Sequence, residues 1–174
     1  SAIGRTTDAL VAAVELAMGG QLQAARPGVS AIRDDLYSAA GAILTDESLL
    51  AGLLDRHVDD IDRLLIDLAA AEPQRCHSMT DATLSHGERI SSVVMTWVLQ
   101  QQGFDAVHVD AREVLVTDDR FTEAAPLSGP TNERLRDVVR PLCDVGRIVV
   151  LGGFIGRTLD GRTSTLGRGG SDLS

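Results

Sequence analysis

The sequence contains no lysine, so all 16 of its basic residues are arginine, and 25 aspartates and glutamates outnumber them. The net charge of -9 argues against a nucleic-acid-binding protein, because such proteins present a basic surface to phosphate groups. Long apolar runs are also absent, and the short ones fall well below the roughly 20 residues that cross a bilayer. We therefore expect no nucleic-acid partner and no membrane span.

Cysteine is scarce as well, since Cys76 and Cys143 are the only two. Two isolated cysteines provide no disulfide framework and are typical of buried thiols in a reducing compartment, which favours a cytoplasmic location. Cys76, His77 and His86 lack the spacing of zinc ligands. Asp118-Asp119 follows an expected strand, where adjacent carboxylates usually form a turn. The sequence therefore predicts no metal site.

The chain of 174 residues is long enough for one domain with a hydrophobic core, and 44% of its residues are hydrophobic and 24% charged. The chain begins without methionine, and its last residues follow directly on an expected helix start. We therefore expect it to be part of a longer protein.

The apolar pattern predicts helices that alternate with short strands. Helices are expected over 8–18, 21–44 with an interruption near Pro27, 45–72, 85–102 and 131–145. Short runs at 104–110, 113–117 and 147–151 indicate strands. Such alternation predicts an α/β fold, a three-layer αβα sandwich with a mainly parallel sheet covered on both faces.

The stretch 152–172 follows the last expected strand and is dense in glycine. It holds seven of the 17 glycines, interleaved with hydroxyl residues and with Arg157, Arg162 and Arg168. Glycine allows close approach to a ligand, and a donor-rich loop between a strand and a helix start, here Ser171-Asp172, is how α/β proteins hold anions. A flexible linker is the alternative, and no Walker A pattern is present. The order of donors after a strand favours the anion-binding loop.

Glu88 has two interpretations. Its spacing from Ser85 fits a capping box at a helix start, which is the default for this pattern. The functional interpretation is a carboxylate placed to receive an ammonium group. Residues 1–7, Phe121 and the glycine-rich stretch all follow expected strands, beyond whose carboxyl ends ligands bind in parallel sheets. We therefore expect these segments and Glu88 to share one pocket.

Four segments, in this order, resemble the catalytic domain of aspartate kinases, in the amino-acid kinase superfamily. Ser1-Ala2-x-Gly4-x-x-Thr7-Asp8 resembles the first substrate loop, and Gly87-Glu88-Arg89-Ile90-Ser91 resembles the Gly-Glu-Arg-x-Ser segment. Asp110-Ala111-Arg112 through Thr117-Asp118-Asp119-Arg120-Phe121 resembles the central segment. The most specific match runs from Gly153-Phe154-Ile155-Gly156 through Gly161-Arg162-Thr163-Ser164-Thr165-Leu166-Gly167-Arg168-Gly169-Gly170-Ser171-Asp172.

The resemblance implies transfer of the γ-phosphoryl group of ATP, bound with Mg²⁺, to the side-chain carboxylate of L-aspartate. The product is 4-phospho-L-aspartate, the entry to lysine, threonine and methionine biosynthesis. Glu88 is implied to bind the substrate ammonium group and Arg168 a substrate carboxylate. The other implied residues of the aspartate pocket are Ser1, Thr7, Phe121, Ser171 and Asp172, and those of the phosphate loop are Gly167, Gly169 and Gly170. A homo-oligomer is also implied.

The sequence departs from the family at Arg5, where glycine is usual. The family's Lys-x-Gly-Gly loop would lie before Ser1, and its nucleotide-binding half and any regulatory ACT domains would follow Ser174. Residues 1–174 are thus expected to form only the aspartate-binding half. Because phosphoryl transfer needs cations that stabilise the transferring group, we expect this lysine-free segment alone not to turn over. Two alternatives stay open: a non-catalytic binding or assembly module of the same fold, and an amino-acid kinase with another acceptor, such as glutamate.

Overall fold

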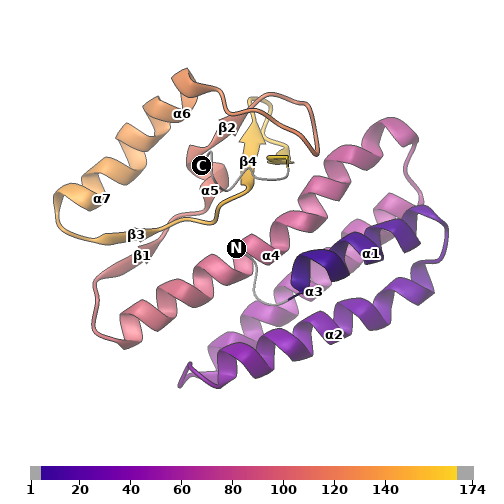
Figure 1. Ribbon diagram of the computed structural model, residues 1–174, viewed down its shortest axis with the longest axis horizontal. Coiled ribbons are helices and arrows are strands. Elements are labelled where there is room, and N and C mark those ends of the chain that lie inside the picture. The colour runs from indigo at the N-terminus through magenta and orange to yellow at the C-terminus, as the bar shows by residue number, and fades with distance from the viewer. Residues whose placement is uncertain (1–4, 168–174) are drawn as a thin grey trace.

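The first half of the protein consists of four helices. In the computed structural model, which describes residues 5–167, they are α1 (Thr6–Met18), α2 (Leu22–Gly41), α3 (Glu47–Ala69) and α4 (Pro73–Gln101). Consecutive helices pack together, and α1 also contacts α3 and α4. Figure 1 shows α4 crossing the middle of the molecule, with α1–α3 on one side and the strands on the other. The helix α4 is therefore shared by both halves.

Residue spacing explains α3. Its buried side chains recur at helical intervals and join the core formed with α1, α2 and α4: Leu50, Leu53, Leu54, Ile61, Leu65 and Leu68. The carboxylate of Asp46 caps its first turn by accepting hydrogen bonds from the backbone N–H groups of Ser48 and Leu49, each at 3.1 Å. The helix predicted over 45–72 is confirmed, although it ends at Ala69 and Pro73 begins α4.

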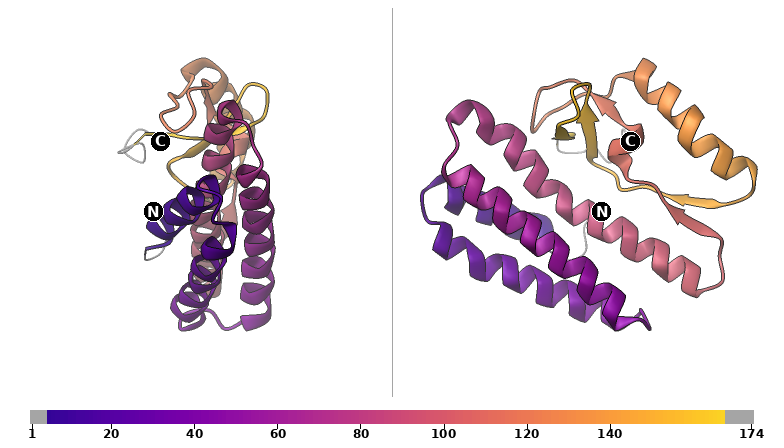
Figure 2. Two further views of the ribbon diagram at one scale, coloured as in Figure 1. Left: turned by 90° about the vertical axis from the view of Figure 1, so that its right-hand side faces the viewer. Right: turned by 180° about the vertical axis from the view of Figure 1, so that it is seen from behind.

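The second half alternates strands and helices. Its elements are β1 (Ala106–His108), α5 (Ala111–Val114), β2 (Val116–Thr117), α6 (Ser128–Arg134), the π-helical turn η1 (Leu135–Val139), α7 (Arg140–Asp144), β3 (Ile148–Val150), β4 (Ile155–Thr158) and β5 (Thr163–Thr165). β1 pairs with β3 and β2 pairs with β4, both in parallel, whereas β4 and β5 are antiparallel. The β1–β3 pair contacts both α4 and α7 and lies between them in Figures 1 and 2. The predicted α/β fold with mainly parallel pairing is confirmed.

The helix predicted to begin at Ser85 instead begins at Pro73 and runs unbroken to Gln101. Ser85 and Glu88 therefore lie inside α4, and the capping-box prediction is wrong. The hydroxyl of Ser85 donates to the carbonyl of Ala82 at 2.7 Å, a bond that a serine inside a helix makes to the preceding turn. Pro73, which stands at the first helical turn, supplies the true start.

Two other local predictions differ from the structure. α2 continues through Pro27 without interruption, and burial of Ala25, Val29 and Ile32 on its core face holds the helix together across the missing N–H donor. The segment 113–117, predicted as extended, is helical up to Val114 and extended from Leu115 onward. Among residues 5–167, no helix is both long and apolar enough to span a membrane.

Candidate functional site

Four polar side chains form a stripe along α4. Asp81, Ser85, Glu88 and Ser92 are spaced by four, three and four residues, which places them on one face of the helix. All four are buried, and Glu88 is the most exposed of them at 7%. The two serines donate to carbonyls of the preceding turn, so their burial leaves no hydroxyl unsatisfied. This stripe faces the strand-containing half of the protein, since α4 packs against β1, β3 and β5.

Gly152 lies directly against α4 at Glu88. A Cβ atom at position 152 would be 3.2 Å from the carbonyl oxygen of Glu88, a separation that real side chains rarely adopt. Because β3 ends at Val150, this contact is made at the carboxyl end of a parallel strand. The glycine-rich stretch thus meets α4 at Glu88 with its first glycine, and the shared pocket stays a prediction.

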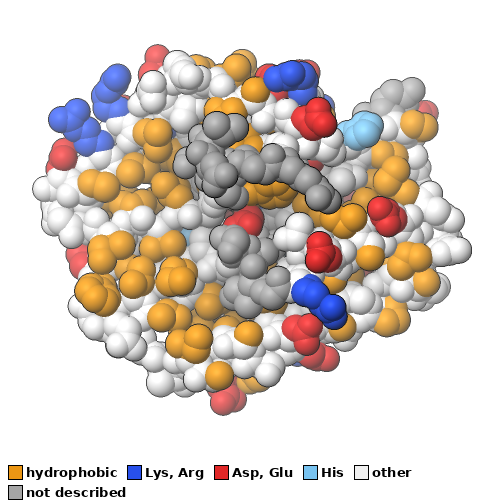
Figure 3. All heavy atoms as spheres, in the orientation of Figure 1, with side chains coloured by type: hydrophobic (Ala, Val, Ile, Leu, Met, Phe, Trp, Pro, Cys, Tyr) orange, Lys and Arg blue, Asp and Glu red, His pale blue; other side chains and the backbone are white. Residues whose placement is uncertain are grey.

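A hollow of about 390 Å³ opens beside this contact. Its polar lining comes from Glu88, Ser91 and Ser92 of α4. Its other walls are apolar residues at the end of α2 and just after it, further apolar residues of α4, and the segment 150–153. A second hollow of about 400 Å³ shares Leu151–Gly153 and is otherwise lined by residues of α5, the β2 region and α6. Figure 3 shows hydrophobic side chains gathered over this part of the surface, where Ile43, Met95 and Leu151 are exposed. An apolar hollow with a few convergent polar groups is typical of small-ligand sites.

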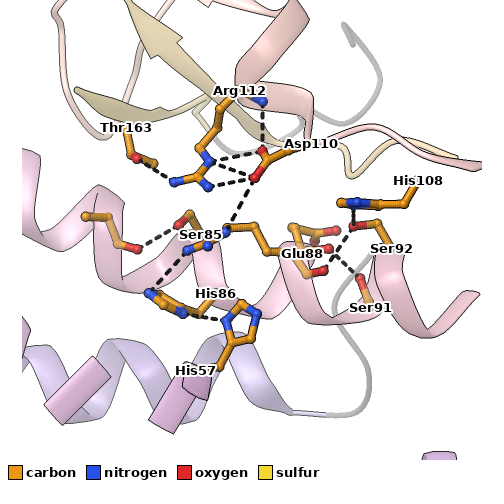
Figure 4. Close-up of polar contacts among 12 residues, drawn as sticks. His57, Ser85, His86, Glu88, Ser91, Ser92, His108, Asp110, Arg112 and Thr163 are labelled. Carbon is orange, nitrogen blue, oxygen red and sulfur yellow. Dashed lines mark hydrogen bonds and ion pairs between the residues drawn. The ribbon is translucent and has the colours of Figure 1, made fainter. Parts of the chain in front are cut away.

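A line of charged side chains crosses α4 next to Glu88 (Figure 4). Asp110 pairs with Arg112 at 2.6 Å and with Arg89 at 3.7 Å, and Arg112 also donates to the hydroxyl of Thr163 at 3.2 Å. Burial alone would raise the pKa of Asp110, but hydrogen bonds from Arg112 and the charges of both arginines outweigh burial and hold that pKa below its usual value. The ionised Asp110 thus fixes α5 and β5 against α4.

Asp81, one end of the polar stripe, holds two distant segments. Its oxygens accept hydrogen bonds from the backbone N–H of Thr122 at 2.9 and 3.1 Å, and from the backbone N–H and hydroxyl of Thr165 at 2.8 and 2.7 Å. Sequence reasoning missed this residue. The spacing of Asp81 from Glu88, seven residues, places both on one face of a helix and could have indicated it. Because the helix was predicted to start at Ser85, Asp81 fell outside that helix.

The predicted site residues occupy different positions. Phe121 is half-buried after the turn at Asp118, with the guanidinium of Arg162 4.7 Å from its ring centre. Gly167 follows β5, and a Cβ atom added there would lie 3.8 Å from the Cα of Glu123. Thr7 is exposed in the first turn of α1. The remaining predicted residues lie outside the described part of the chain: Ser1, Arg168, Gly169, Gly170, Ser171 and Asp172. The structure thus joins Glu88 to the start of the glycine-rich stretch, and the roles of all these residues stay predictions.

Metal ligation finds no support in the described residues, where no three His, Cys, Asp and Glu side chains are grouped to hold an ion. Asp118 instead forms the predicted turn, accepting hydrogen bonds from the backbone N–H groups of Arg120 and Ala125.

Parallel strands that end in a glycine turn against a buried carboxylate define an α/β protein of the kind that binds small polar ligands at strand ends. The model of the amino acid kinase family matches residues 1–174. The chain therefore belongs to the amino acid kinase family.

Several relatives of the chain are aspartokinases. It is 36% identical over 120 residues to the lysine-sensitive aspartokinase 3 of Escherichia coli K12, an overlap of 67% of this chain and 26% of the relative. It is 31% identical over 176 residues to the bifunctional aspartokinase/homoserine dehydrogenase 2 of the same organism, covering 100% of this chain and 20% of the relative. The chain thus spans about a quarter or less of these relatives.

The structural comparison agrees. The crystal structure of E. coli aspartokinase III in complex with aspartate and ADP superposes with a TM-score of 0.83 and 30% identity. The superposition covers 99% of this chain and 37% of that one.

Proposed function

We propose that this chain is the aspartate-binding part of an aspartate kinase, whose complete form transfers the γ-phosphoryl group of ATP to the side-chain carboxylate of L-aspartate. The observation that carries the proposal is the match of nearly the whole chain, at 30% identity and a TM-score of 0.83, to an aspartokinase crystallised with aspartate and ADP. The burial of a carboxylate, Glu88, at the end of a parallel strand supports the same function.

In this proposal Glu88 accepts hydrogen bonds from the ammonium group of aspartate. Its side chain is largely buried beside the 390 Å³ hollow, where a charged ligand group requires a charged partner. The guanidinium of Arg168 binds a substrate carboxylate, because its planar fork of donors matches two carboxylate oxygens. The remaining pocket residues are the predicted Ser1, Thr7, Phe121, Ser171 and Asp172, and Gly167, Gly169 and Gly170 leave room for the phosphate groups.

Phosphoryl transfer is accelerated mainly by positioning the reactants and by stabilising charge on the transferring group. The described residues serve the first of these purposes. ATP, bound with Mg²⁺, would be held by the remainder of the enzyme, which we propose to be a cytoplasmic homo-oligomer in the biosynthesis of lysine and related amino acids. The 174-residue chain alone is expected to be inactive.

The acceptor assay tests this function. The complete enzyme, supplied with MgATP, is incubated separately with L-aspartate, L-glutamate and N-acetyl-L-glutamate, and hydroxylamine trapping of the acyl phosphate is measured beside ADP release. We expect hydroxamate only with aspartate. Phosphorylation of either other acceptor in preference to aspartate contradicts the proposal, and aspartate binding without any ADP release supports a non-catalytic binding module instead.

A further inference from the structure

The carboxylate of Asp81 joins three segments that are far apart in the sequence. It is fully buried on α4, and its two oxygens accept hydrogen bonds from Thr122, which is 41 residues away, and from Thr165, which is 84 residues away. Three donors make these bonds: the backbone N–H groups of Thr122 and Thr165, whose directions the backbone fixes, and the hydroxyl of Thr165 at 2.7 Å. Asp81 therefore links a helix, a loop and a strand at one point.

Each linked segment leads to a residue that we place in the aspartate pocket. Thr122 directly follows Phe121, and Thr165, the last residue of β5, stands three residues before Arg168. Asp81 itself is seven residues before Glu88, which puts the two on the same face of α4, two turns or about 10 Å apart. Glu88, Phe121 and the strand that precedes Arg168 in the sequence thus share one anchor.

The loop at Thr122 needs such an anchor. Thr122 has a φ of +70°, a left-handed conformation that a β-branched residue adopts only when its surroundings enforce it. Both oxygens of Asp81 accept from its N–H group, which supplies that enforcement. The turn that presents Phe121 is consequently held by α4 as well as by its own residue Asp118.

An ionised carboxylate suits these donors better than any other side chain of this size. Backbone N–H groups only donate, and a carboxylate offers two oxygens that only accept. An asparagine would keep one acceptor and turn an NH₂ group toward an N–H donor. Burial raises the pKa of Asp81, and the hydrogen bonds from Thr122 and Thr165 oppose that rise.

We propose that Asp81 is a positioning residue for aspartate binding, which sets the separation of Glu88 from the segments that carry Phe121 and lead to Arg168. The inference rests on the proposed function, because these three residues are its substrate contacts. Asp81 acts through them and does not itself touch substrate. Loss of its carboxylate would weaken aspartate binding while leaving the ATP site in place.

The test is Asp81→Asn in the complete enzyme. We expect the KM for aspartate to rise about tenfold or more, as for loss of hydrogen bonds to a charged group, with the KM for ATP within about twofold of wild type. Thr165→Val, which removes one hydroxyl bond and keeps the shape, should shift the aspartate KM in the same direction by a smaller factor. Thr165→Ser, which keeps the hydroxyl, should have the wild-type KM for aspartate. Thr165→Val also serves if Asp81→Asn fails to fold.

Thr83→Val is the matched control. Thr83 is equally buried on α4, but its hydroxyl bonds only to the carbonyl of Met79 in the same helix. Its substitution should lower the melting temperature without changing the ratio of the two KM values. An unchanged aspartate KM in both Asp81→Asn and Thr165→Val, or the same KM shift in Thr83→Val, overturns the inference.

Amide hydrogen exchange separates this inference from the function on which it rests. We expect Asp81→Asn to speed exchange selectively at the amides of Thr122 and Thr165. If the wild-type enzyme phosphorylates aspartate and the variants behave as Thr83→Val does, the positioning role fails and the proposed function stands. If the wild-type enzyme does not use aspartate, the proposed function fails, and equal exchange at both amides in wild type and Asp81→Asn then overturns the anchor as well.

Discussion

The Nδ1 atoms of His57 and His86 lie 2.7 Å apart, and the two rings meet edge to face at 88°. One ring must donate its hydrogen to the other, so the accepting ring is neutral. Both rings are buried between α3 and α4, at 8% and 2% exposure. Burial, and secondly the charge of Arg89, lower the pKa of His57 to about 4 and that of His86 to about 2. The pair therefore joins α3 to α4, and burial favours the form in which both rings are neutral.

The pair predicts that stability falls as the pH is lowered. Unfolded, each histidine binds a proton near pH 6.5, whereas folded His57 does so only near pH 4 and His86 lower still. The stabilisation is thus complete above pH 6.5 and is lost as the pH falls from 6.5 toward 4, at up to about 1.4 kcal/mol per pH unit for each histidine. The measurement is the melting temperature of the complete protein between pH 7.5 and 5.

Variants of single histidines show which side chain causes the pH dependence of the melting temperature. His57→Asn removes one of the two protons, so its melting temperature should depend less steeply on pH than that of the wild type. His77→Gln replaces an exposed histidine at the start of α4 and should keep the wild-type slope. Identical slopes in wild type and His57→Asn would mean that the buried pair is not the source of the pH dependence.

Replacing three different glycines with alanine should change the stability of the protein to different degrees. A Cβ at Gly156 would lie 2.8 Å from the carbonyl oxygen of Leu115, one at Gly152 would lie 3.2 Å from that of Glu88, and one at Gly129 would meet nothing within 4 Å. We expect Gly156→Ala and Gly152→Ala to destabilise by about 1–3 kcal/mol, with Gly156→Ala the larger. Gly129→Ala, inside α6, should be neutral or slightly stabilising. Urea denaturation of the three variants measures the order, and a Gly152→Ala variant as stable as Gly129→Ala would argue against the close contact with α4.

The parts of the fold that local pattern predicts are those whose cause is local. α3 follows from its leucine spacing and from Asp46, which caps the N–H groups of Ser48 and Leu49, two and three residues later. The end of α1 at Met18 is also predictable from the sequence, because Gly19-Gly20 follows it. Gly20 has a φ of +74°, a conformation that favours glycine. These features need no knowledge of the rest of the chain.

The parts that pattern misses depend on distant partners. Thr163–Thr165 is a polar segment that reads as a loop, yet it forms β5, because Ser164 bonds to Thr117 and Thr165 to Asp81. Ser85-x-x-Glu88 matches a capping box whether it begins a helix or lies within one, and only packing on both sides of α4 decides between the two. The partners of Asp81 could not be predicted for the same reason, since they are 41 and 84 residues away.

The location of Glu88 inside α4, and not at its start, sharpens the prediction for Glu88→Gln in the complete enzyme. A capping residue would affect helix stability, but here the side chain lies within a continuous helix and lines the hollow beside Gly152. Glutamine keeps the shape and one acceptor oxygen and removes the charge that the substrate ammonium group requires. We expect the KM for aspartate to rise about 10- to 100-fold, as for loss of a charge-assisted hydrogen bond, with the KM for ATP nearly unchanged.

Glu72→Gln makes the same chemical change at an exposed position that flanks the start of α4 and caps it with no side-chain hydrogen bond. It should leave both KM values at the wild-type level, because it removes one negative charge far along the helix from the hollow. Steady-state kinetics with each substrate varied in turn measure all three proteins. Equal rises in both KM values for Glu88→Gln, together with a lower melting temperature, would show that its carboxylate serves the packing of α4 instead of the ammonium group, since a general loss of packing weakens both substrates alike.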